Sequence, residues 1–318
     1  MPTPVFLTVD TEIMWRHHVA GHDVETLFAR SFEPGGVGVS YQVGLLQRYG
    51  LKATYFVDPM PALVYGLDPF KRLIEAILTA GQEVQLHLHP NWIGAKAGDK
   101  GHGRGPSNIN ELTLDAQRDL LGGARDLLVA AGAPTPIAFR GGNYGANDDT
   151  LAALAELAFR YDSSHNGAAH PWPSAISLAE SQIAPIEHQG IVEVPVSLIE
   201  DAPGRMRHFQ ICALSAAEMR AALDHASDND HAAVTIVNHG FELANRNGTA
   251  PNAVHVSRFE ALCTMLAERR DALPTAHFAD RPLLRLGRDD RPMGASLTRR
   301  RWRQAEQLWS NLVAERVA

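Results

Sequence analysis

Residues 84–90 read Val-Gln-Leu-His-Leu-His-Pro, and this run alternates apolar and polar side chains with the period of a β-strand. The alternation places Gln85, His87 and His89 together on one face of that strand. Two imidazoles two residues apart, followed by a proline that ends the strand, are able to bind a single metal ion. The same pair in isolation is more often two hydrogen-bonded histidines in a loop, so a second observation is needed.

A second strand-like run supplies that observation. The segment Phe6-Leu-Thr-Val-Asp-Thr-Glu12 is apolar at first and ends with two carboxylates spaced two residues apart, Asp10 and Glu12. Because carboxylate and imidazole groups occur together at the ends of two strands, a metal site is favoured over two histidines that are merely hydrogen-bonded.

Strand-like runs alternate with longer helical patterns along most of the chain. This order predicts parallel strands joined by right-handed crossovers, and seven or eight such units favour a closed, irregular (β/α) barrel over an open sheet. Glycines that follow the helical patterns act as stop signals. We expect strands near 4–10, 53–58, 83–89, 136–140, 159–163, 191–198, 233–239 and 275–279, and helices over 39–48, 69–80, 113–131, 148–158, 215–227 and 256–272.

Composition is that of a globular protein, and the length allows one large domain or two ordinary ones. The chain has 318 residues, of which 45% are hydrophobic and 20% charged, and a net charge of −7 argues against general nucleic-acid binding. Cys212 and Cys263 have no CxxC spacing and are expected to be buried and structural. Neither a signal sequence nor a membrane span is recognisable, which predicts a cytoplasmic enzyme without membrane contact.

The barrel is expected to occupy residues 1–290, and residues 291–318 form a basic, helical C-terminal tail. Eight arginines fall within 281–303. A helix predicted over 297–316 carries its large apolar residues on or near one side, and we expect it to dock on the barrel or on a neighbouring subunit. A basic patch for an anionic substrate is the alternative. The apolar residues are Trp302, Leu308, Trp309 and Leu312.

Two loops stand out beside this framework. Residues 93–111 are rich in Gly, Lys and Asn and are expected to be mobile, and the proline-containing segment 164–190 is expected to wall a substrate cleft. Three histidines after the first motif are expected to be exposed to solvent: His17, His18 and His22.

In a parallel barrel the active site lies at the C-terminal ends of the strands. Five predicted strands here end in a titratable or metal-binding residue, and this coincidence predicts a metal-assisted hydrolase. The residues are Asp10 and Glu12, His87 and His89, Arg140, Asp162, and His239.

The order and spacing of these segments resemble the NodB-homology polysaccharide deacetylases, a family of irregular (β/α) barrels. The resemblance covers about residues 4 to 280. Its motifs are similar to Thr8-Val-Asp-Thr-Glu12, Gly81-Gln-Glu-Val-Gln-Leu-His87-Leu-His89, Phe139-Arg-Gly-Gly-Asn-Tyr144, Tyr161-Asp-Ser-Ser164 and Ile236-Val-Asn-His239.

The resemblance implies hydrolysis of a non-peptide C–N bond, as in deacetylation of an N-acetylated sugar, with a divalent metal that is usually zinc in this family. Asp10 would be the general base, Arg140 would hold Asp10 ionised, and His239 would protonate the leaving amine while Asp162 stabilises its charged form. The implied metal ligands are Glu12, His87 and His89, and the implied substrate contacts are Asn143, Tyr144, Val237 and Trp92.

Two departures from the family pattern leave alternatives open. The first motif usually has two adjacent aspartates, so the roles of Asp10 and Glu12 are open to exchange. The usual second histidine lies four residues after the first, where this chain has Asn91. His89 is preferred as the second ligand because it shares a strand face with His87.

The function also has alternatives. A cyclic amide or imide hydrolase of the same barrel family is one, and a non-catalytic carbohydrate-binding relative without metal is another. An amidohydrolase barrel is disfavoured because its HxH pair lies on the first strand. The expected partner is a small-molecule or oligosaccharide substrate rather than nucleic acid, and a homo-oligomer is left open.

Overall fold

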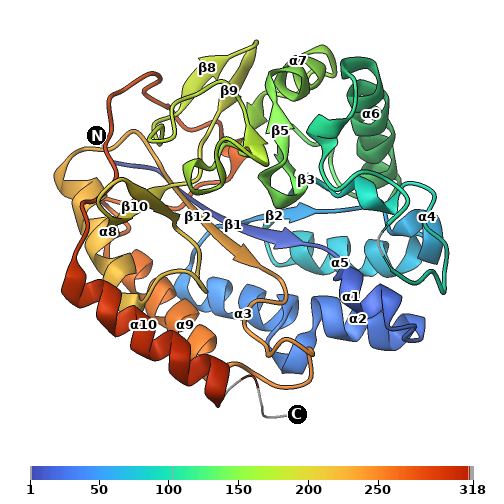
Figure 1. Ribbon diagram of the computed structural model, residues 1–318, viewed down its shortest axis with the longest axis horizontal. Helices are drawn as coiled ribbons and strands as arrows, with labels where there is room; N and C mark the ends of the chain where they lie inside the picture. Colours follow the sequence, from blue (N-terminus) through green and yellow to red (C-terminus); the bar gives the residue numbers. More distant parts are fainter. Residues whose placement is uncertain (1, 102, 314, 316–318) are drawn as a thin grey trace.

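A curled sheet of eight strands forms the centre of the computed structural model, which describes residues 2–101, 103–313 and 315 (Figure 1). All neighbouring strands pair in parallel except the last two, which are antiparallel. The order is β12 (Val234–His239), β1 (Val5–Thr11), β2 (Thr54–Val57), β3 (Glu83–Leu88), β4 (Ala138–Gly141), β6 (Tyr161–Asp162), β9 (Ile191–Glu193) and β8 (Ile186–His188).

The barrel is irregular because its ladder does not close. Between β9 and β12 the segment 194–211 spans the opening with individual backbone hydrogen bonds. Val196 N–H donates to the His165 carbonyl at 2.9 Å, and Ser197 N–H donates to the Thr235 carbonyl at 3.1 Å. The strand predicted over 191–198 is therefore wrong beyond residue 193, where Pro195 has no N–H to offer a ladder.

Helices cover the outer face of the sheet, and several begin where a side chain caps them. Thr113, Asn147, Ser215 and Asn252 each accept a hydrogen bond from a first-turn N–H of the helix that follows. The predicted helices are confirmed, with bounds shifted by a few residues. They are α3 (Val39–Tyr49), α5 (Asp68–Thr79), α6 (Leu114–Ala130), α7 (Asp148–Glu156), α8 (Ala216–Asp228) and α9 (Ala253–Glu268).

Smaller elements fill the connections. Two helices that the sequence did not predict, α1 (Trp15–Val19) and α2 (Val24–Phe32), follow β1. The expectation that His17 and His18 are exposed is wrong, since 4% and 2% of their surfaces are accessible. Other short elements include α4 (Ala62–Tyr65) and the paired strands β5 (Ala146–Asn147) and β7 (Ser174–Ala175).

Alternation along β1 divides the core into two parts. Val5, Leu7 and Val9 pack in the large apolar cluster beneath the helices, whereas Phe6 belongs to a smaller cluster inside the curled sheet. The same alternation places Asp10 on the face of Phe6, at the C-terminal end of the strand. The barrel interior is therefore apolar at one end and carries charged groups at the other.

Phe278 closes the apolar end. Its ring stacks on Phe6 with centroids 4.5 Å apart and meets Phe56 edge-on at 5.8 Å. The buried Glu83 carboxylate accepts hydrogen bonds from the backbone N–H groups of Phe278 and Ala279 at 2.9 and 2.7 Å. The segment near 275–279, predicted as a strand, forms a single bridge to Val5 and then this plug.

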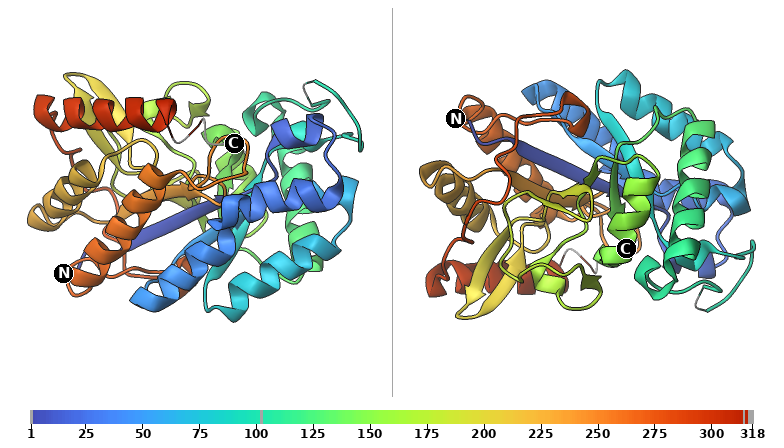
Figure 2. Two further views of the ribbon diagram at one scale, coloured as in Figure 1. Left: turned by 90° about the horizontal axis from the view of Figure 1, so that it is seen from below. Right: turned by 90° about the horizontal axis from the view of Figure 1, so that it is seen from above.

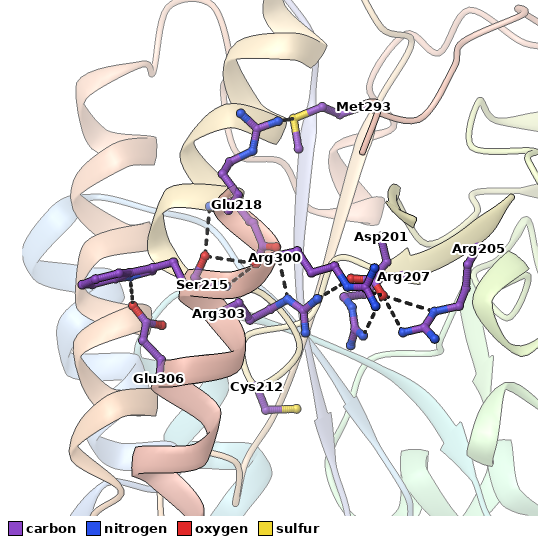
Figure 3. Close-up of polar contacts among 12 residues, drawn as sticks. Asp201, Arg205, Arg207, Cys212, Ser215, Glu218, Met293, Arg300, Arg303 and Glu306 are labelled. Atoms are coloured by element: carbon purple, nitrogen blue, oxygen red, sulfur yellow. Dashed lines mark hydrogen bonds and ion pairs between the residues drawn. The ribbon is translucent and has the colours of Figure 1, made fainter. Parts of the chain in front are cut away.

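The C-terminal helix α10 (Leu297–Leu312) lies on the outside, against α9 and the hairpin of β10 (Leu198–Ala202) and β11 (Arg205–His208) (Figure 2). Arg303 reaches inward from it, donates to Glu218 at 3.1 Å and pairs with Asp201 (Figure 3). The apolar side of α10 was expected to dock on the barrel or on a neighbouring subunit. It does not dock on the barrel of its own chain, since Trp302, Leu308, Trp309 and Leu312 are each more than half exposed.

Within the described part of the chain, no helix is long and apolar enough to cross a membrane.

Candidate active site

The strand ends of the barrel bring most of the predicted site residues together. Asp10 pairs with His239 in the β1–β12 ladder, and His87 pairs with Arg140 in the β3–β4 ladder. Because parallel strands end at one rim, these four side chains converge on the end of the barrel opposite Phe278.

Arg140 and Asp10 form a buried ion pair. The Arg140 Nη1 atom lies 2.9 Å from Asp10 Oδ1, and the two side chains are 0% and 4% exposed. The guanidinium is held by further bonds to Thr8 Oγ1 at 2.7 Å and to the Ser163 carbonyl at 3.0 Å. It also lies over the Phe56 ring, 4.6 Å from its centroid. With so many contacts, Arg140 fixes where the Asp10 carboxylate points.

Glu12, His87 and His89 form a cluster of potential metal ligands. One ligand atom from each of them lies within 4.8 Å of the others. His87 Nε2 is 3.4 Å from Glu12 Oε2, and His89 Nε2 is in direct contact with the same oxygen. Two imidazole nitrogens and one carboxylate oxygen are a donor set that zinc accepts, with a fourth position left for water or substrate.

Neighbouring groups orient both imidazoles. The Nδ1 atom of His87 bonds to the Arg140 carbonyl at 2.7 Å, which leaves Nε2 turned toward Glu12. His89 lies against Gly142, where a built Cβ atom would approach His89 Nδ1 to 2.4 Å. Glycine at this position therefore gives the second imidazole its space.

Charge within the cluster is balanced without a metal. Burial lowers the pKa of His89, but the adjacent Glu12 carboxylate outweighs this and raises that pKa to about 9. Burial by itself raises the pKa of Glu12, yet the two imidazoles hold it well below its usual range. A metal cation would replace the imidazolium charge that now compensates Glu12.

Glu242 is a site residue that the motif analysis missed. His239 Nδ1 lies 2.8 Å from Glu242 Oε2, and Gln210 donates to the same oxygen at 2.8 Å. Burial lowers the pKa of His239, but Glu242 outweighs this and raises that pKa to about 9. Burial alone would raise the pKa of Glu242, but the hydrogen bond from His239 holds it at about 2. The sequence does carry one indication of this pair, because Glu242 lies three residues after His239, at the end of a predicted strand.

The structure does not place Asp162 beside His239, where the resemblance implied it. Four strands separate β6 from β12 in the sheet order. The buried Asp162 carboxylate accepts from Ser164 N–H at 3.0 Å and Ser164 Oγ at 2.8 Å. Burial raises the pKa of Glu193, and the adjacent Asp162 raises it further. Asp162 therefore holds Ser164, which follows directly on Ser163, the residue that binds Arg140. The carboxylate that contacts His239 is that of Glu242, where the resemblance implied Asp162.

Asp58 is a second residue that the motifs did not indicate. It follows β2, is fully buried, and its Oδ2 atom has no hydrogen-bond partner among the described residues. Burial raises the pKa of Asp58 to about 6, although the charges of His89 and His87 oppose this. A carboxylate held against the metal-ligand cluster adds a negative charge that favours cation binding.

A cavity of about 410 Å³ opens beside Glu12 and His89. Asn143, which was expected to contact the substrate, lines this cavity. Trp92 contributes little surface because it is 2% exposed and packs edge-on against Trp15 at 4.8 Å. Trp15, which also lines the cavity, is the more accessible indole, so the aromatic wall comes from α1.

The two residues after the arginine strand adopt unusual backbone conformations. Asn143 and Tyr144 have φ angles of 56° and 61°, which non-glycine residues rarely adopt. The Tyr144 hydroxyl is buried without a partner in the described chain. Val237, two residues before His239, is fully buried in β12, beneath the strand end. Asn91 lines the cavity, and its Oδ1 atom is also without a described partner.

No protein-family model and no curated protein matches the sequence. Solved structures do resemble it. A Mycobacterium smegmatis protein described as a polysaccharide deacetylase matches with a TM-score of 0.55 and 19% identity, over 91% of this chain and 95% of its own. A family 4 carbohydrate esterase from Streptomyces lividans, solved with acetate, matches with a TM-score of 0.46 and 15% identity, over 92% and 98%.

A 4-alpha-glucanotransferase from Thermococcus litoralis also matches, with a TM-score of 0.52 and 9% identity, over 88% of this chain and 40% of its own. The chain has the NodB-type polysaccharide deacetylase fold that its motifs predict. Because proteins with different activities share such a barrel, the reaction has to be argued from the site.

Proposed function

We propose that this protein is a metal-dependent hydrolase that cleaves a non-peptide amide bond, with the N-acetyl group of a sugar as its target. One observation carries the proposal: the Glu12–His87–His89 cluster lies at the same end of the barrel as Asp10 and His239, and Glu12 and His89 line a cavity there. Amide hydrolysis needs an activated water, a stabilised carbonyl oxygen and a proton for the leaving amine.

The ligand set fits a divalent cation such as zinc. Its three donors come from β3, from the residue that follows β3, and from the residue that follows β1, and the backbone carbonyl of Arg140 fixes the coordinating nitrogen of His87. When bound, such a cation would polarise the amide carbonyl and lower the pKa of a coordinated water.

Asp10 is proposed as the general base. Its Oδ1 atom is bound to Arg140, so Oδ2 is the oxygen that accepts a proton from the attacking water. The ion pair also keeps the carboxylate in one orientation, which removes the cost of aligning it during the reaction. Tyr144 and Asn143 are proposed to contact the substrate, and Val237 to lie under the acetyl group.

His239 is proposed as the general acid. Glu242 stabilises its protonated form, so at neutral pH the imidazolium is ready to donate to the leaving nitrogen. An amine leaves poorly as an anion, and protonation at this atom is what allows the C–N bond to break.

Elemental analysis of the purified protein and three variants tests the metal site. We expect about one divalent metal per chain, loss of that metal in His87→Ala and His89→Ala, and retention in Asn91→Ala, the matched control. Metal retained in His89→Ala but lost in Asn91→Ala would move the second ligand to Asn91.

Acetate release tests the reaction. Metal-loaded protein should release acetate from chitooligosaccharides, and chelation should stop the release. A protein that binds metal but hydrolyses only cyclic amides or imides would belong to the alternative within this barrel class. A protein that binds sugars without metal and without turnover would contradict the proposed enzyme.

A further inference from the structure

Two arginines line the cavity without a part in the proposed chemistry. Arg16, in α1, and Arg246, in the loop after β12, share the lining with the metal ligands Glu12 and His89. Both arginines are exposed. They come from segments about 230 residues apart, so the fold rather than the local sequence brings them together.

Their guanidinium groups remain largely available to a ligand. Within the described residues, the Arg16 guanidinium contacts the Met14 sulfur at 2.9 Å, and no ion pair or hydrogen bond of the Arg246 guanidinium is formed. Partial burial of its side chain lowers the pKa of Arg16, and the positive charge of Arg246 lowers it further, while Glu315 opposes both effects. Two like charges held close to each other favour an anion between them.

Glu315 is the nearby carboxylate, and it is already engaged. Its Oε2 atom accepts from the backbone N–H of Arg246 at 2.7 Å, and its Oε1 atom accepts from Asn252 Nδ2 at 3.1 Å. It neutralises part of the positive charge, which leaves a net surplus from the two arginines.

The arginines also connect two hollows. A second cavity, of about 590 Å³, is lined by Arg16 and Arg246 together with Glu242 and Cys212. The two cavities thus share both arginines, which lie between the metal ligands and the second cavity. A substrate held at the metal ligands and extending toward the second cavity has to pass these two charges.

We propose that the substrate carries an anionic group, a carboxylate or a phosphate, which Arg16 and Arg246 bind while the amide lies at Glu12, His87 and His89. This inference rests on the proposed hydrolase and specifies its substrate class. Arginine matches carboxylate and phosphate oxygens with paired N–H donors. The net charge of −7 on the whole chain repels anions in general, so the pair supplies a local attraction at the cavity alone.

Selectivity between neutral and anionic N-acetyl sugars tests the proposal. We would measure kcat/KM of the metal-loaded protein for N-acetylglucosamine, N-acetylmuramic acid and N-acetylglucosamine 6-phosphate, which separates a carboxylate from a phosphate. The better anionic compound should exceed the neutral one by about tenfold or more, and Arg16→Gln and Arg246→Gln should each reduce that ratio about tenfold. Arg291→Gln, at an exposed surface pair, is the control.

Binding measured by calorimetry on the same proteins separates this proposal from the proposed reaction. If no compound is hydrolysed, anion-selective binding that the double variant loses still supports the arginine site. Equal kcat/KM, or equal binding, for neutral and anionic compounds overturns it even if acetate is released. A selectivity that survives in the double variant overturns it as well.

Discussion

Asp10 Oδ2 and His239 Nε2 lie 3.9 Å apart, on strands that pair residue for residue. The proposed base and the proposed acid therefore face each other across one ladder, while Arg140 and Glu242 hold them from opposite sides. Once His239 has given its proton to the leaving amine, the proton that Asp10 took from water would have a short path back to the neutral histidine.

The roles of Asp10 and Glu12 separate in a pair of variants. Asp10→Asn keeps an acceptor for Arg140 but removes the base, so we expect kcat to fall by about 10²–10⁴-fold with the metal retained. Glu12→Gln removes a ligand charge and should release the metal. Acetate release and elemental analysis of both proteins provide the measurement, and metal loss in Asp10→Asn would exchange the two assignments.

The pH profile depends on Glu242. A proposed acid with a pKa of about 9 stays protonated at neutral pH, so kcat should fall only as the pH rises through about 9. Glu242→Gln removes the main stabilising charge, and the alkaline limb should move down by about one to two pH units. Glu260→Gln, on the outer helix α9, is the control. An unmoved limb would show that Glu242 does not tune His239.

Asp58 should destabilise the metal-free protein at neutral pH. Its pKa is about 6 when folded against 3.8 as the ordinary value, so the folded state binds the proton more tightly. The free energy of unfolding should therefore decrease as pH rises from about 4 to 6. Asp58→Asn should raise the free energy of unfolding by about 1–3 kcal/mol at pH 7.5 and change it little at pH 4, as measured by urea unfolding of metal-free protein. Equal effects at both pH values would contradict the buried charge.

Arg303 should hold α10 in place. Its side chain is 8% exposed, and it pairs with Asp201 and Glu218, which are 1% and 3% exposed. Arg303→Met leaves buried carboxylates with fewer partners and should cost about 3–5 kcal/mol in urea unfolding. Arg291→Met, which breaks an exposed pair, should change stability by less than about 1 kcal/mol. If the two variants lose similar amounts of unfolding free energy, the buried Arg303 ion pairs stabilise the protein no more than the exposed pair does.

Strand alternation made the metal-ligand cluster predictable. The period of two in residues 84–90 placed His87 and His89 on one face, and the structure brings both to Glu12. The helices were predictable for the same reason, since their periodicity and caps act locally.

The missed features depend on contacts between distant segments. His17 and His18 are buried because the chain folds back, and Trp15, Trp92 and Tyr65 surround His18. Arg16 and Arg246 meet only in the folded chain. Asp162 was assigned to His239 through the family pattern, whereas four strands lie between β6, which carries Asp162, and β12 in the sheet order. The sequence did not show that α10 docks through a polar side chain, Arg303, because its large apolar residues dominate the helical pattern.

The His239–Glu242 pair lies within four consecutive residues, so one short segment carries both the proposed proton donor and the carboxylate that raises its pKa. Where such a pair is divided between two strands, both strands have to change together for the acid to be retuned. Grafting residues 239–242 onto another barrel with the same strand end would therefore transfer His239 together with the Glu242 carboxylate that raises its pKa. Directed evolution of the pH range could likewise be confined to this single loop.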